Sequence, residues 1–104
     1  MLMIDANKVH ELLEPRSLIE ALRTAHRGGM PGQSDRAIYQ EPNAQGQPDI
    51  FIVLTAWQRN EGILAKLVTS FPNNKTRHDL PTVNSLYVYI NAETGIAEAV
   101  IDGE

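Results

Sequence analysis

The residue types change sharply at Arg36, and this change constrains the fold more than any other feature of the sequence. Before it, Leu18, Ile19, Leu22 and Ala25 recur at the spacing of one helical face. After it, β-branched and aromatic residues come in runs separated by turn residues, which is typical of strands. A block of helices followed by a block of strands predicts the α+β class.

Two short helices are expected in the first part of the chain. Asp5 is placed to cap a helix over residues 6–13, because its carboxylate can accept hydrogen bonds from the free N–H groups of the first turn. Pro15 suits the first position of a second helix, since the N–H that proline lacks would be unpaired there. Gly28 and Gly29 predict where that helix ends. We expect its apolar face to pack on a sheet.

Four strand-like runs follow, and a fifth is expected near the end. They cover residues 36–40, 49–58, 62–70, 83–91 and 96–101. A short strand at residues 2–4 can join them. Most links between runs are short, and Gly95 stands where a bulged hairpin needs a positive φ. The pattern predicts an antiparallel sheet of about five or six strands, and residues 72–81 are expected to form a longer polar loop.

Composition excludes several kinds of protein. A chain of 104 residues is the size of one domain, which we place at residues 1–104. The formal net charge is −4 and the nine basic residues are scattered, so a nucleic-acid partner is not expected. The longest apolar runs are strand-sized, and the first residues lack the features of a signal peptide, so no membrane association is expected. The absence of cysteine fits a cytoplasmic protein.

Most sequence signatures of catalysis or cofactor binding are missing. The three histidines lack the spacing of metal ligands: His10, His26 and His78. The glycines at positions 28, 29 and 32 do not form a dinucleotide fingerprint. Three glutamates of the helical part are expected to face water: Glu11, Glu14 and Glu20. The sequence therefore predicts no metal or cofactor site within the chain.

The residue that stands out is Lys66, which lies in the apolar run 62–70. One interpretation is an edge-strand lysine, whose stem packs against the sheet while its ammonium group reaches water. The other is a cation in a pocket, which would bind a carboxylate or exchange protons with a substrate amine. The residue pattern alone leaves both interpretations open.

Three segments, in this order and at similar spacing, resemble the ornithine cyclodeaminase/mu-crystallin family. They are Lys66-Leu-Val-Thr-x-Phe-Pro-x-Asn, Leu80-Pro81-Thr82-Val83 and Ala92-Glu93-Thr94-Gly95. The resemblance extends over essentially the whole chain. It implies the N-terminal, dimer-forming and substrate-binding portion of such an enzyme. In the family this portion continues into an Arg-Thr-Ala-Ala helix and a Rossmann domain for NAD(P), which are absent from residues 1–104.

The resemblance also implies site residues. In that family an arginine on an early strand and the lysine of the first motif hold the substrate carboxylate, which implies Arg36 and Lys66 here. Lys66 would in addition be catalytic, by helping proton transfer near the substrate amine. Thr82 is the third implied binding residue. Simpler explanations are a solvated arginine at a strand start for Arg36, and a β-branched residue that begins a strand for Thr82.

The function that follows from the resemblance belongs to a larger enzyme. It would use NAD(P) on an α-amino acid or its cyclic imine, as a lyase that deaminates with cyclisation or as an oxidoreductase that reduces an imine. Residues 54–56, Leu-Thr-Ala, depart from the usual Met-Pro-Ala of the family and weaken any choice of substrate.

The chain itself is expected to bind no NAD(P), to be inactive alone, and to form a homodimer or a larger assembly. The alternative is a stand-alone dimeric binding or assembly module without catalysis, which would pair through an exposed sheet edge. A reading frame that continues past Glu104 with Arg-Thr-Ala-Ala and Gly-x-Gly-x-x-Gly would favour the enzyme.

Overall fold

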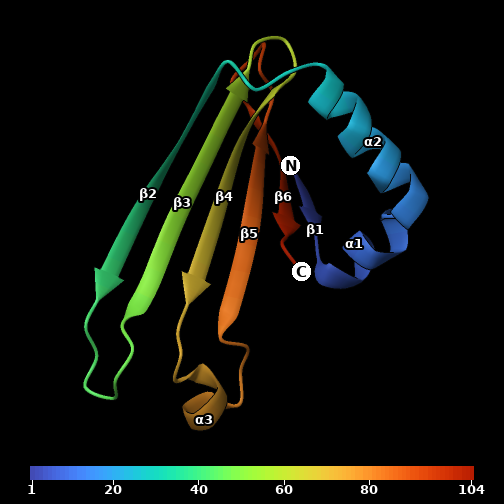
Figure 1. The fold of residues 1–104 in the computed structure, drawn as a ribbon. Coiled ribbons are helices and arrows are strands. Elements are labelled where there is room, and N and C mark those ends of the chain that lie inside the picture. The colour runs from blue at the N-terminus through green and yellow to red at the C-terminus, as the bar shows by residue number, and fades with distance from the viewer.

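The computed structural model describes residues 1–104 as three helices and one six-stranded sheet (Figure 1). In chain order the elements are β1 (Leu2–Ile4), α1 (Ala6–Leu12), α2 (Pro15–Arg27), β2 (Gln33–Glu41), β3 (Asp49–Gln58), β4 (Gly62–Ser70), α3 (Asn74–His78), β5 (Val83–Ile90) and β6 (Ala97–Asp102). None of the helices has the length and hydropathy of a membrane span. The predicted α+β class and the number of strands are confirmed.

The strands lie in the order β1-β6-β5-β4-β3-β2. Strands β2 to β6 pair in sequence as antiparallel neighbours. β1 pairs with β6 in parallel and sets Met3 opposite Val100. The sheet is therefore mixed, which corrects the prediction of a wholly antiparallel sheet. β1 and β6 come from opposite ends of the chain and no short turn joins them. The turn residues in the sequence therefore could not show whether the two strands pair in parallel or antiparallel.

Capping carboxylates begin the first two helices. Asp5 Oδ1 accepts a hydrogen bond from the Lys8 backbone N at 2.9 Å, as predicted for the first helix. Glu14 caps α2, and its carboxylate accepts hydrogen bonds from the backbone N atoms of Ser17 at 2.8 Å and Arg16 at 3.0 Å. These bonds lower the pKa of the Glu14 carboxyl from its ordinary value. Glu14 faces water, as expected, and in addition caps α2, which the sequence analysis did not predict.

The apolar face of α2 is only partly covered. None of its residues is buried, and the side chains of Ile19 and Leu22 are about half exposed, at 49% and 50%. α1 is the helix that comes close to the sheet, at β6. The chain has two buried residues, Val9 on α1 and Ala99 on β6. The apolar stripe correctly predicted the helix, but the expected packing of this face on the sheet is wrong, because α2 makes no extensive contact with any strand and none of its residues is buried.

The link between β4 and β5 contains the short helix α3, where the sequence predicted only a polar loop. The Phe71 backbone N donates to the carbonyl oxygen of Thr82 at 2.8 Å and closes the base of this link. The Asn74 side chain donates to the Pro81 carbonyl oxygen at 3.0 Å. Five residues are too few for a helical repeat to be visible in the sequence.

The register of the strands gives the sheet two different faces. Val53, Leu67 and Leu86 form one cross-strand row. Lys66 and Tyr87, which are adjacent to these positions in the sequence, pair with each other and lie on the opposite face, because successive side chains of a strand alternate. One face is therefore aliphatic along this part of the sheet, and the other carries charged and phenolic groups.

Candidate functional site

A pocket on the sheet is lined by residues of β2, β3, β4 and β5. Its volume is about 460 Å³, which lies within the roughly 300–1,000 Å³ that is usual for small-molecule sites. Its apolar lining comes from Leu54, Ala56 and Leu64, and its basic residues are Arg36 and Lys66. An apolar surface with two cations on it suits a small ligand that carries a negative charge.

The strand register explains why residues far apart in the sequence line this pocket. Arg36 pairs with Leu54, Leu54 with Lys66, and Lys66 with Tyr87, so the four form one row across four strands. Neighbouring strands are about 4.8 Å apart, which puts the Cα atoms of Arg36 and Lys66 roughly 10 Å apart. Both side chains are long, so their charged ends can reach one ligand above Leu54.

Neither cation is neutralised within the chain. The three ion pairs of the structure are Lys8–Glu11, Arg23–Glu20 and Lys75–Asp79. Asp35 is the one carboxylate of the pocket lining, and its Oδ1 accepts a hydrogen bond from the Arg36 backbone N at 2.7 Å. Arg36 is exposed and Lys66 is half-buried. Two basic groups without carboxylate partners are thus available to an anion.

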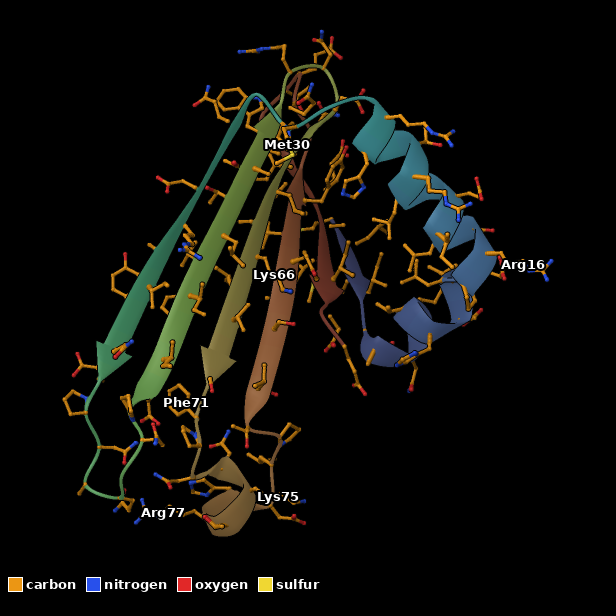
Figure 2. All side chains as sticks on the ribbon, viewed as in Figure 1. Arg16, Met30, Lys66, Phe71, Lys75 and Arg77 are labelled. Atoms are coloured by element: carbon orange, nitrogen blue, oxygen red, sulfur yellow. The ribbon has the colours of Figure 1, made fainter.

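Lys66 lies inside the sheet, since β4 stands between β3 and β5. Figure 2 shows it midway along these strands. The strand order excludes the interpretation of Lys66 as an edge-strand lysine. Its Nζ is 5.2 Å from the centre of the Tyr87 ring, which is a cation–π distance.

Thr82 is not brought into this pocket. It lies in the link before β5, and the neighbouring Val83 pairs with Ser70 at the end of β4. Ser70 is four residues beyond Lys66, which corresponds to roughly 13 Å along a strand. The structure therefore groups the two predicted cations and leaves Thr82 at the far end of the same strands, where its role stays a prediction.

Tyr87 is the pocket residue that sequence reasoning did not single out. In Val83–Ile90 the residues Ser85, Tyr87 and Tyr89 alternate with aliphatic ones, so they share one face of the strand and a signal was present in the sequence. Its position beside Lys66 depends on the pairing of β4 with β5, which alternation does not give. Ser34 and Thr55 also line the pocket, and no motif distinguishes them from other polar strand residues.

The hairpin between β3 and β4 fixes the strands on which the pocket is built. Asn60 has a φ of 66°, a conformation that asparagine tolerates well. The Tyr89 hydroxyl donates to the Glu61 carbonyl oxygen at 3.1 Å and ties the turn to β5. Gly62 is needed next to this bond, because a Cβ atom there would stand 2.6 Å from the Tyr89 ring. These contacts hold β4 in register with β5.

A larger cleft, of about 970 Å³, lies between the C-terminal half of α2 and the β3–β4 turn. Its lining includes Glu20 and Glu61 but no lysine or arginine, so its charge does not suit a carboxylate ligand. His26 also lines it, and its Nδ1 is 2.7 Å from the carbonyl oxygen of Leu22. The structure brings no three His, Asp or Glu side chains into a group that can hold a metal ion.

The residues present do not form a cradle for a dinucleotide. Such a cradle needs a glycine-rich turn between a strand and the N-terminus of a helix, where the free N–H groups bind the pyrophosphate. Gly28 and Gly29 follow α2, and Gly32 comes just before β2, so none of them occupies such a turn. No step of the chemistry can therefore be derived through NAD(P) on these residues.

The chain thus has an α+β fold, with a pocket on its sheet that carries two basic side chains without carboxylate partners. No protein-family model matches it. A delta(1)-pyrroline-2-carboxylate reductase of Colwellia psychrerythraea is 33% identical over 107 residues, which cover 99% of this chain and 32% of the reductase. The resemblance to the ornithine cyclodeaminase/mu-crystallin family that was inferred from the sequence is confirmed.

Three solved structures share the fold. A lysine cyclodeaminase, studied for its recognition of L-lysine, L-ornithine and L-2,4-diamino butyric acid, has a TM-score of 0.76 at 21% identity over 99% of this chain and 33% of its own. The delta(1)-pyrroline-2-carboxylate reductase of Thermococcus litoralis, in complex with NADH and L-proline, has 0.73 at 18% identity over 99% and 32%. An archaeal alanine dehydrogenase dimer with bound NAD has 0.67 at 22% identity over 98% and 31%. The chain spans about a third of the length of each relative.

Proposed function

We propose that residues 1–104 form one domain that binds the substrate carboxylate for an NAD(P)-dependent enzyme of the ornithine cyclodeaminase type. The substrate would be an α-amino acid or its cyclic imine. The observation that carries this proposal is the placement of Arg36 and Lys66 over one pocket, in one cross-strand row, with no carboxylate of the chain paired to either. The similarity to reductases and cyclodeaminases of amino acids supports the same ligand class.

Arg36 and Lys66 would contact the substrate in different ways. The planar guanidinium of Arg36 can hold a carboxylate with two parallel hydrogen bonds. Lys66 offers a compact charge with three donors, so it would bind the same carboxylate and lie near the adjacent amine or imine nitrogen. There it would act as the catalytic residue of this chain, by holding or delivering a proton at that nitrogen. Thr82 would contact only a ligand that reaches well beyond the pocket.

The remaining chemistry is assigned to residues outside this chain. NAD(P) supplies hydride transfer in enzymes that use it, and residues 1–104 contain no cradle for it. The chain would accordingly bind the carboxylate but be inactive alone. Whether the parent enzyme deaminates with cyclisation or reduces an imine depends on groups that residues 1–104 do not contain.

We also propose that the chain forms a homodimer through its sheet. Phe51, Leu67 and Leu86 lie on the face of the sheet opposite the pocket, and Phe51 and Leu86 are 38% and 36% exposed. A monomer that exposes such a face would leave much apolar surface in water, which favours association. The mass of the chain in solution tests this: a dimer that Leu67→Glu converts to a monomer is expected, and a monomeric wild type would contradict the proposal.

A titration followed by heteronuclear NMR tests the binding function. L-Proline and L-ornithine should shift resonances of the pocket strands, whereas L-prolinamide, which keeps the ring but lacks the carboxylate, should bind much more weakly. Arg36→Ala and Lys66→Ala should each raise the Kd for proline by about tenfold or more, as expected for the loss of a charged hydrogen bond. NAD should cause no shifts.

The outcomes separate the proposal from its alternatives. Proline binding that survives Lys66→Ala, or that is no stronger than prolinamide binding, would contradict the carboxylate site. A dimer that binds none of these ligands would instead favour the stand-alone assembly module. Thr82→Ala serves as a further comparison, since it should leave proline binding unchanged if the ligand stays within the pocket.

A further inference from the structure

The ammonium group of Lys66 has an unusual set of neighbours for a half-buried cation. No carboxylate lies within ion-pair distance, and no hydrogen bond joins its Nζ to another group of the chain. The one interaction the structure gives it is with the Tyr87 ring, whose centre is 5.2 Å from Nζ. Tyr87 is its direct cross-strand partner and lines the same pocket. The two side chains therefore leave the sheet side by side.

An aromatic ring holds a cation in a way that suits an anion site. A lysine side chain is flexible, and fixing it in one rotamer costs up to about 2 kcal/mol of side-chain entropy. A carboxylate partner could fix it but would cancel its charge. The face of a ring attracts the ammonium through its quadrupole and adds no negative charge. Lys66 thus keeps its full charge for a ligand while its position is restricted.

The other aromatic contacts of the chain show that this arrangement is specific to Tyr87. Arg59 stands 5.0 Å from the centre of the Trp57 ring, but neither residue lines the Lys66 pocket. Tyr89 follows Tyr87 on the same face of β5, yet its hydroxyl is bonded to the Glu61 carbonyl oxygen and its ring packs against Gly62. Tyr87 has no such structural bond. Its ring is the one that contacts the pocket cation.

We propose that Tyr87 is a positioning residue, which holds the ammonium of Lys66 over the pocket with the face of its ring. The proposal rests on the carboxylate-binding function above for its purpose, but the contact itself can be measured without a ligand. The ring should be the essential part. Phenylalanine should therefore replace Tyr87, and an aliphatic residue should not.

The experiment uses the three lysines of the chain, Lys8, Lys66 and Lys75, enriched with ¹³C at Cε. Lys8 and Lys75 are in exposed ion pairs and serve as internal references. In the wild type, the Hε protons of Lys66 should be shifted upfield by the ring current and should show cross-relaxation to the Tyr87 ring protons. Lys66→Arg assigns the signal.

Tyr87→Phe should keep the upfield shift of Lys66, and Tyr87→Ile, which preserves strand propensity, should abolish it. Tyr89→Phe is the matched control, since it should weaken the β3–β4 turn without moving the Lys66 signal. In the proline titration, Tyr87→Ile should raise the Kd roughly threefold to tenfold, and Tyr87→Phe should leave it within about twofold of the wild type.

Two results would overturn the inference. One is a Lys66 signal in the wild type with neither an upfield shift nor cross-relaxation to Tyr87, which requires no variant to fold. The other is a Tyr87→Phe variant as impaired in binding as Tyr87→Ile, because the hydroxyl and not the ring would then be the important group. If the wild type binds no carboxylate but its Lys66 signal shows the ring-current shift, the proposed function is contradicted, and the contact between Lys66 and Tyr87 is still supported.

Discussion

The centre of the sheet and helix α2 are stabilised in different ways. Every residue of β4 is half-buried, because β3 and β5 flank it and side chains in cross-strand rows shield one another. No residue of α2 is buried, although its apolar stripe is well formed. The sheet therefore depends on contacts between distant segments, and α2 depends on local features such as its cap. The pocket is built entirely on the sheet, from the edge strand β2 to β5, and includes no residue of α2.

A glycine in each region gives the strongest contrast. Gly62→Ala should destabilise the chain by about 1–3 kcal/mol, because the new Cβ would overlap the Tyr89 ring and disturb the β4–β5 register. Gly28→Ala at the end of α2 should change stability by less than about 0.5 kcal/mol, since Gly28 has a φ of −75° and its nearest Cβ contact would be 3.4 Å. Denaturant unfolding measures both, and equal effects would contradict the contrast.

Leucines give a second, smaller contrast. Leu67→Ala on β4 should cost about 1–2 kcal/mol, because a half-buried side chain loses part of its burial against its cross-strand neighbours. Leu22→Ala on α2 should cost less than about 0.5 kcal/mol, since the side chain is half exposed and both residues favour helices. The midpoints of urea unfolding report the difference. A loss at Leu22 as large as that at Leu67 would mean that α2 has a cover in solution.

The smallest expected effect concerns the cap of α2 and its dependence on pH. The pKa of Glu14 is lowered by hydrogen bonds from the backbone N–H groups of Ser17 and Arg16 and from the Ser17 hydroxyl. Because the folded pKa lies below the ordinary value of 4.5, the cap stabilises the helix above that pH and is lost as the pH falls through the lowered pKa. Helical circular dichroism should therefore decline on acidification.

Glu14→Gln should flatten this acid-dependent decline, since glutamine does not titrate. Glu20→Gln removes the same charge from α2 but no backbone cap, so it should keep the decline. If Glu14→Gln and the wild type lose helix at the same pH, another group controls the transition. The measurement needs circular dichroism from about pH 6 to about pH 3, the range in which glutamate side chains titrate.

The sequence predicted most of the local structure but little of the long-range arrangement. Strands β3 and β4 begin and end at the predicted residues, and Gly95 has the expected positive φ of 72°. These features depend on a few neighbouring residues. The parallel pairing of β1 with β6 joins the two ends of the chain, so no local signal gives it. The exposure of the apolar face of α2 was likewise not visible in its own residues, because it depends on where the sheet lies.

The candidate site divides in the same way. Motif resemblance implied Arg36, Lys66 and Thr82 together, but strand register places only the first two in one row. Thr82 belongs to the motif Leu80–Val83. Hydrogen bonds from Phe71 and Asn74 to carbonyl oxygens of this motif close the link between β4 and β5. Tyr87 matches none of the motif segments and was recognised only from its pairing with Lys66.

The most direct test of this account is a double-mutant cycle on proline binding with Arg36→Ala, Lys66→Ala and the double variant. If the two cations hold one carboxylate, losing either one already breaks the shared site. The Kd of the double variant should then be within about twofold of the Kd of the weaker-binding single variant. Losses in binding free energy that simply add would mean that Arg36 and Lys66 act on separate ligands or separate groups, and would contradict the single carboxylate site.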